Sequence, residues 1–217
     1  MSMSAYFFLI PLLIFTSCKK NPVDRLTNPL PDGDVAQSSG IFIVYDDDLK
    51  TGGGLGLIPS GGNQTIDLTA VGTPARTLRH IQYSWSGADV GGQHLFAGFQ
   101  LLITPDSSTL SAETAKNLSA AGYTRMTLYV RGQLSDGNSL RIEGPSNGDS
   151  AFVPARTTLA STELTNDWQS VTLTIPPGDF SSVKIFATFS FQYTQPPRTT
   201  NAGGGGSIFV DEIRYER

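Results

Sequence analysis

The sequence predicts an all-β protein, a sandwich of two antiparallel β-sheets with one short helix. Three observations predict this fold class. Apolar residues recur in short runs with a period of two, which is the spacing of strands that bury one face. The 23 glycines and 13 prolines supply the turns that many strands need. With 217 residues, the chain is long enough for one sandwich that buries most of its apolar surface without a disulfide.

The apolar pattern predicts nine strands along the chain. They cover residues 41–45, 65–71, 78–85, 95–103, 125–131, 139–143, 168–175, 183–193 and 207–215. Residues 52–62 contain six glycines and are predicted to be a loop, because glycine weakens strands. Residues 202–207 are rich in glycine as well and are also predicted to be a loop.

A turn and a helix complete the predicted elements. Asp136-Gly137 predicts a tight hairpin turn between the strands on either side of it. Residues 111–118 predict the one short helix, with Ser111 as its N-cap and Glu113 near the positive end of the helix dipole.

The composition excludes several classes of function. Hydrophobic residues make up 39% of the chain and charged residues 16%, which argues against a chain kept disordered by charge repulsion. The formal net charge is -4, and Lys19 and Lys20 form the one basic cluster in the sequence. No nucleic-acid partner is therefore expected, because phosphate binding requires grouped basic residues.

Residues 1–17 have the pattern of a signal peptide. Residues 5–16 are an apolar run that, as a helix, would reach only about 18 Å of the roughly 30 Å hydrocarbon core, too short for a membrane span. The sequence FTSC that ends at Cys18 resembles a bacterial lipobox, in which the cysteine is lipidated and becomes the mature N-terminus. Phe15 stands where leucine is usual, and residues 1–4 carry no Lys or Arg. A plain secretory signal with an incidental cysteine therefore stays open as the alternative.

Residues 18–39 are expected to be the lipid-anchor cysteine and a flexible linker. They contain three prolines and several polar residues without a periodic apolar pattern, which is typical of a tether. The sandwich domain is expected to cover residues 40–217. Because Cys18 is the only cysteine in the chain, packing, with or without a metal ion, must stabilise this domain in place of disulfides.

Four segments in this order resemble a known family. They are VYDDDL at 44–49, GYTRMTLYVRG at 122–132, NDWQSVTL at 166–173 and SIFVDEIRY at 207–215. Together with FAGF at 96–99, they resemble the galactose-binding-like jelly rolls that serve as carbohydrate-binding modules of bacterial glycoside hydrolases. The resemblance covers residues 40–217. It implies the jelly-roll form of the sandwich and a carbohydrate ligand, although function has to be argued from the site itself.

The resemblance also implies a structural calcium ion, which this family commonly holds where its first and last strands meet. Asp46, Asp47 and Asp48 follow the first predicted strand, and Asp211 lies on the last. Calcium binds six to eight hard oxygens, and these four carboxylates are the candidate ligands. The alternative is a solvated acidic turn. Asp211 favours the metal, because a carboxylate within an apolar strand needs a partner.

Strand alternation nominates a sugar-binding face. Planar polar groups hydrogen-bond to sugar hydroxyls, and aromatic rings stack on sugar C–H faces. The candidates on outward strand positions are Tyr129, Arg131, Arg141, Glu143, Gln100 and Gln192. If their strands are neighbours in one sheet, these residues line one concave surface. The competing interpretation is a set of cross-strand pairs with little energetic value.

The two tryptophans of the chain have different expected roles. Trp85 is a further ligand-binding candidate, either as a stacking platform or as a core residue, because it shares a strand face with Ile81 and Tyr83. Trp168 lies in the Trp-Gln-Ser-Val pattern that the family uses for packing, and it is expected in the core.

The sequence shows no pattern that indicates catalysis. Its two histidines, His80 and His94, are not accompanied by a Gly-x-Ser-x-Gly motif or by a zinc ligand set. The expected function is non-catalytic capture of poly- or oligosaccharides by a lipoprotein anchored in the outer membrane of a Gram-negative cell envelope. The alternatives are a scaffold domain that binds envelope proteins and, third, a small glycan-active enzyme.

Overall fold

The computed structural model describes residues 40–49, 53–58, 63–72, 76–86, 96–105, 107–110, 112, 114–193 and 205–217. The expected signal peptide, the anchor Cys18 and the linker lie outside the described residues, as does His94. Within the described ranges, no helix is both long and apolar enough to cross a membrane.

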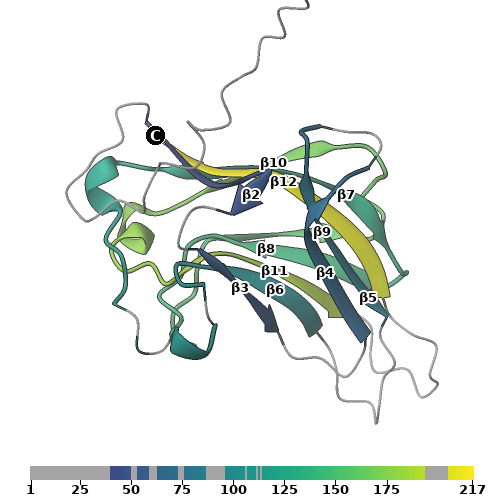
Figure 1. The fold of residues 1–217 in the computed structure, drawn as a ribbon, viewed down its shortest axis with the longest axis horizontal. Helices are drawn as coiled ribbons and strands as arrows, with labels where there is room; N and C mark the ends of the chain where they lie inside the picture. Colours follow the sequence, from purple (N-terminus) through teal and green to yellow (C-terminus); the bar gives the residue numbers. More distant parts are fainter. Residues whose placement is uncertain are drawn as a thin grey trace, which may run out of the picture.

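The predicted sandwich of two antiparallel sheets is confirmed (Figure 1). The first sheet, here sheet A, has the order β10 (Gln169–Thr174), β7 (Arg125–Leu134), β12 (Gly205–Glu216), β1 (Ile41–Asp46) and β2 (Asp48–Leu49). It also contains β5 (His80–Ser86), which pairs with β12, and β4 (Asn63–Ala70), which pairs with β5. Sheet B has the order β3 (Gly54–Ile58), β6 (Phe96–Leu102), β11 (Ile185–Tyr193), β8 (Asn138–Glu143) and β9 (Arg156–Ala160).

The long last strand organises sheet A. One edge of β12 pairs with β7, while its other edge pairs first with β5, from Gly205 to Val210, and then with β1, from Ile213 to Glu216. The change of partner falls at a bulge where Glu212 has a φ of 48°. Asp211 therefore lies where β1, β5 and β12 meet, and the first and last strands are neighbours as the resemblance implied.

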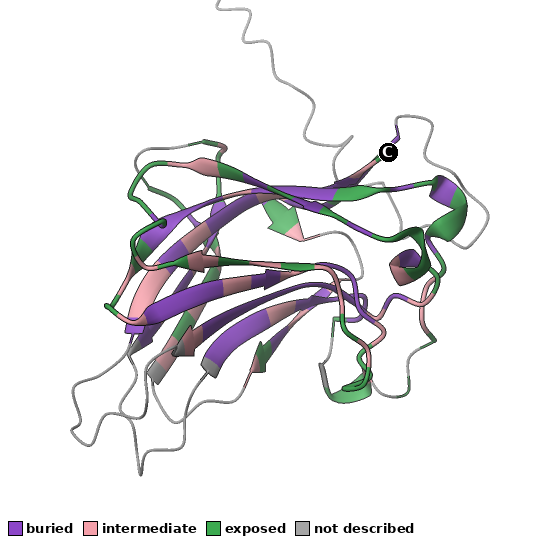
Figure 2. Cartoon of the chain, turned by 180° about the vertical axis from the view of Figure 1, so that it is seen from behind, coloured by how far each residue is buried: buried purple, intermediate pink, exposed green. Residues whose placement is uncertain are grey.

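The core between the sheets is rich in aromatic rings, and the strands of both sheets turn buried positions toward it (Figure 2). Phe99 of β6 stacks on Phe189 of β11 with centroids 4.8 Å apart, and Phe42 of β1 stacks on Tyr215 of β12 at 5.7 Å. Trp85 is only 5% exposed and packs near Phe191. The prediction of Trp85 as a ligand-binding residue is therefore wrong, because no open ring face remains.

The predicted helix at 111–118 is not found among its described residues. The backbone of Lys116 exchanges two hydrogen bonds of 2.8 Å with Val183, so the segment forms a β-bridge in place of a helical turn. The helical elements within the described ranges are three short 3₁₀ turns: η1 (Ser107–Thr109), η2 (Ser119–Ala121) and η3 (Pro177–Phe180).

Three of the described strands, β2, β3 and β9, were not predicted, and one predicted turn has a different role. β3 lies within the glycine-rich segment that was predicted to be a loop; a Cβ at Gly54 would collide with the backbone of Thr104 and Pro105, so glycine is needed there. β9 was not predicted. The Asp136-Gly137 turn exists, with Gly137 at a φ of 79°, but it joins β7 of sheet A to β8 of sheet B. The hairpin prediction is therefore wrong.

Candidate functional site

The six residues predicted for one sugar-binding surface are divided between the two sheets. Tyr129 and Arg131 lie on β7 of sheet A. The other four lie on sheet B, on β6, β8 and β11: Gln100, Arg141, Glu143 and Gln192. Since the core separates the sheets, the prediction of one shared surface is wrong. Each sheet instead presents its own outward face.

The outward face of sheet B collects polar groups across adjacent strands. Strand register places Gln100, Thr188 and Glu143 in one row, and it places Ser190 beside Arg141 in the next. Gln192 lies opposite Ser139 in a third row. The side chains Gln100, Arg141, Glu143, Thr188, Ser190 and Gln192 are called here the polar face. Two of them, Thr188 and Ser190, were not predicted, because small hydroxyls carry no distinctive sequence signal.

Side-chain contacts within the polar face hold its planar groups in place. The Nε atom of Arg141 lies 3.3 Å from a carboxylate oxygen of Glu143. With the Gln192 amide turned so that its oxygen faces the guanidinium, this oxygen accepts hydrogen bonds from Nε and Nη1 of Arg141 at 2.9 and 3.0 Å. Ser190 Oγ is buried without a hydrogen-bond partner. The face therefore offers a fixed guanidinium, which suits sugar hydroxyls, while the Ser190 hydroxyl lies buried beneath it.

On the outward face of sheet A, the ring of Tyr129 is already covered. The guanidinium of Arg76 lies 3.1 Å from the centroid of this ring. Arg76 is held there by an ion pair of 2.7 Å with Glu212, at the bulge of β12. Tyr129 therefore faces outward, as strand alternation predicted. Its ring is nevertheless not free to stack on a sugar, because Arg76 covers it.

Arg131 is the centre of a second cluster on this face. Its side chain is 7% exposed, and its guanidinium lies 4.0 Å from the ring centroid of Phe209 and 5.0 Å from that of Trp168. His80 meets both rings edge-on. Burial lowers the pKa of His80, and the charge of Arg131 lowers it further. The prediction of Trp168 as a core residue is wrong, since its partners are outward-facing side chains of sheet A.

A buried carboxylate occupies the junction of β1, β5 and β12. Asp211 is fully buried; its Oδ2 accepts a hydrogen bond of 2.7 Å from the Thr77 hydroxyl, and its Oδ1 accepts one of 2.8 Å from the backbone N–H of Glu212. Burial raises the pKa of Asp211 to about 6, although these two hydrogen bonds act in the opposite direction. Glu212 and Asp46 add negative charge nearby and raise this pKa as well.

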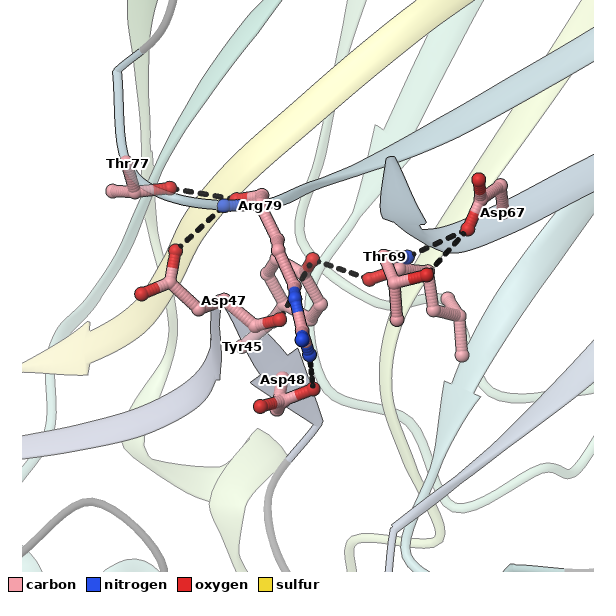
Figure 3. Close-up of polar contacts among 8 residues, drawn as sticks. Tyr45, Asp47, Asp48, Asp67, Thr69, Thr77 and Arg79 are labelled. Atoms are coloured by element: carbon pink, nitrogen blue, oxygen red, sulfur yellow. Dashed lines mark hydrogen bonds and ion pairs between the residues drawn. The ribbon is translucent and has the colours of Figure 1, made fainter. Parts of the chain in front are cut away.

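The Thr77 hydroxyl has two close acceptor oxygens but only one proton to donate. Its Oγ1 lies 2.6 Å from the carbonyl oxygen of Arg79 (Figure 3). The same atom lies 2.7 Å from Asp211 Oδ2. A hydroxyl carries one proton and can donate to only one of these two acceptors. The arrangement of a carboxylate, a hydroxyl and a carbonyl around one point is a set of hard oxygen ligands of the kind that calcium binds.

The acidic run at residues 46–48 lies close to Thr77, because it contacts Arg79, two residues further along the chain. Asp47 Oδ1 accepts a hydrogen bond of 2.9 Å from the backbone N–H of Arg79, while the exposed Asp48 forms an ion pair of 3.2 Å with the Arg79 guanidinium (Figure 3). Within the part of the chain that the structure describes, no three His, Cys, Asp or Glu side chains converge on one point. The four predicted carboxylates therefore do not form a ligand set by themselves, and hydroxyl and carbonyl oxygens would have to complete it.

Comparison with known proteins gives structural likeness alone. No family model and no curated protein matches the chain. A family 11 carbohydrate-binding module of a Clostridium thermocellum cellulosomal cellulase is 14% identical, with a TM-score of 0.45 over 82% of this chain and 94% of that one. A family 30 module from the same organism is 15% identical, with a TM-score of 0.42 over 81% of this chain and 96% of that one. A family 29 module from Piromyces equi is 10% identical, with a TM-score of 0.38 over 81% and 88%.

Proposed function

We propose that residues 40–217 form a non-catalytic carbohydrate-binding domain whose sugar site is the polar face of sheet B. The observation that carries this proposal is the held guanidinium of Arg141, flanked by Glu143 and Gln192. Sugars are recognised by planar groups of this kind, and fixing them before binding removes part of the entropic cost. The sequence resemblance to carbohydrate-binding jelly rolls points to the same ligand class.

Affinity gel electrophoresis of the purified domain against neutral plant, algal and host glycans tests this proposal. We expect at least one glycan to retard the domain and Arg141→Met to weaken binding at least about tenfold, because it removes charge-assisted hydrogen bonds. Arg125→Met is the matched control, since Arg125 pairs with Glu216 on sheet A and lies outside the polar face. It should bind as the unaltered domain does.

Three outcomes would contradict the proposal. If no glycan retards the domain while an envelope protein is captured, the domain is a scaffold. If the purified domain releases sugar from the glycan, it is an enzyme. If Arg141→Met and Arg125→Met bind a retarding glycan equally well, the sugar site lies elsewhere.

We further propose that the domain carries a structural calcium ion, held by Asp211, Thr77 Oγ1 and the Arg79 carbonyl oxygen, with the acidic run Asp46, Asp47 and Asp48 beside them. The surplus of oxygens over protons around Thr77 supports it, as does the burial of Asp211, which forms no ion pair with a described residue. The ion would join β1, β5 and β12 where β12 changes partner. It has no role in the sugar contacts proposed above, which lie on the other sheet.

We also propose that Cys18 is lipidated and anchors the domain in the outer membrane, with residues 19–39 as the tether. In a Gram-negative host, the full chain should fractionate with membranes and incorporate radiolabelled palmitate, because several acyl chains bind a bilayer stably. Cys18→Ala should be soluble and unlabelled. If this variant stays in the membrane fraction, the lipobox interpretation is wrong and the plain secretory signal, or another anchor, replaces it.

A further inference from the structure

A buried positive charge on sheet A has no acidic partner among the described residues. Arg131 makes no hydrogen bond or ion pair with any described residue, and its Nε atom is fully buried without a partner. The acids on the same sheet face are engaged elsewhere: Glu212 with Arg76, Asp211 with Thr77 and Glu212, and Asp67 with Thr69. A guanidinium removed from water without a counter-charge is costly, and a ligand that supplies one is bound strongly.

A second unpaired group lies beside Arg131. His80 is only 2% exposed, and its Nε2 atom has no hydrogen-bond partner. The side chains of Arg131 and His80 converge beside Gly72. A Cβ atom placed on this glycine would lie 3.8 Å from Arg131 Nη2 and 3.8 Å from His80 Nε2. Two polar side chains without a hydrogen-bond partner among the described residues therefore face one position, at which Gly72 itself places no side chain.

Aromatic rings surround these polar groups. Phe209 and Trp168 are half-buried, and each contacts both the guanidinium of Arg131 and the imidazole of His80. Flat rings bind the C–H face of a sugar, and a guanidinium in a partly buried position binds an anionic oxygen pair more strongly than one in water. This combination matches a sugar that carries a negative group.

We propose that Arg131, His80, Phe209, Trp168 and Gly72 form a second ligand site, which binds the anionic group of an acidic carbohydrate, either a uronate carboxylate or a sulfate ester. Arg131 supplies the charge, His80 supplies a neutral hydrogen bond, and the two rings hold the sugar. This site lies on the sheet opposite the polar face. It rests on the proposed function only for the carbohydrate nature of its ligand.

Calorimetry with the whole domain tests this site. The probes are polygalacturonate, its fully methyl-esterified form, which lacks the charge, and λ-carrageenan, which carries sulfate esters. We expect one of the two acidic polymers to bind, binding to weaken as salt is added, and the methyl ester to show at least a tenfold loss if the carboxylate is the ligand. If λ-carrageenan binds and polygalacturonate does not, the anionic group that the site recognises is a sulfate ester.

Two variants separate this site from the polar face. Arg131→Met removes the charge but keeps an apolar stem against the rings, and Gly72→Leu fills the position that both nitrogens face. Both should lose at least tenfold in affinity for the acidic polymer with an unfolding midpoint close to that of the unaltered domain. Arg141→Met should bind the acidic polymer unchanged.

Each failure has its own signature. If neither acidic polymer binds, or if both variants bind it as the unaltered domain does, the second site is overturned, whatever the neutral glycans show. If Arg141→Met loses the acidic polymer while Arg131→Met keeps it, the ligand lies on the polar face and the second site is again overturned. If acidic binding depends on Arg131 while no neutral glycan binds, the second site stands and the proposed role of the polar face fails.

Discussion

Removal of divalent cations with EDTA at pH 7.5 is expected to lower the midpoint of thermal unfolding by about 5–10 °C, and added Ca²⁺ is expected to restore it. The physical reason is linkage: an ion that binds only the folded state stabilises it by about 2.7 kcal/mol at a hundredfold excess over its dissociation constant. For a domain of this size, each kcal/mol moves the midpoint by about 2–4 °C. Mg²⁺ should restore less, because it favours a tighter octahedral geometry.

The pH dependence in EDTA has a defined sign. Because burial raises the pKa of Asp211 from its ordinary value of 3.8 to about 6, the folded state holds this proton more tightly than the unfolded chain does. The contribution of Asp211 to stability is therefore complete below about pH 4 and is lost as the pH rises to about 6, a decrease of about 3 kcal/mol. Calcium, which binds the ionised carboxylate, should offset this decrease.

Asp211→Asn provides the decisive comparison. An amide cannot ionise, so in EDTA at pH 7.5 this variant should be more stable than the unaltered domain, and its stability should not fall between pH 4 and pH 6 through this group. In saturating Ca²⁺ the order should reverse, since the variant has lost the charged ligand. Asp136→Asn, which alters an exposed carboxylate in the turn between β7 and β8, away from this junction, is the control and should change stability little. Identical midpoints in EDTA and Ca²⁺ would exclude the ion.

Truncation of the Phe99 ring is expected to be the most damaging single change in the core. Phe99 is fully buried between the sheets, where it stacks on Phe189 and lies 5.3 Å from the ring of Tyr83. Phe99→Ala should lower the free energy of unfolding by about 3–5 kcal/mol, because it removes apolar burial and leaves a cavity. This loss is a large share of the 5–15 kcal/mol that stabilises a typical domain.

Urea denaturation followed by tryptophan fluorescence measures this loss. Leu57→Ala is the matched control, because Leu57 lies opposite Phe99 on β3 but is 49% exposed. The control should cost well under half of the Phe99→Ala loss. A double-mutant cycle with Phe189→Ala should show a coupling of about 0.5–1.5 kcal/mol from the stacked pair. A loss below about 1 kcal/mol for Phe99→Ala would mean that these sheets do not pack as described.

The sequence was sufficient to predict most of the strand residues that lie inside the sandwich, although not the outward place of Trp168. In β6, the alternation of Ala97, Phe99 and Leu101 with Gly98 and Gln100 predicts the observed buried face, because successive side chains of a strand point to opposite sides. The same reasoning identified nine of the strands to within a few residues, and it failed at β3, where glycines that the close packing requires were taken as loop residues.

Which outward residues lie together was decided only by the tertiary structure. Arg131 and Arg141 have the same sequence pattern, since each alternates with core residues, yet they lie on opposite surfaces. A period of two distinguishes inside from outside but does not identify the neighbouring strand, so the turn at Asp136-Gly137 could not be recognised as a crossing between sheets. The oxygens around Asp211 illustrate the same limit. Thr77, whose hydroxyl also contacts the Arg79 carbonyl, reaches Asp211 across 134 residues of chain, because β12 changes partner at its bulge.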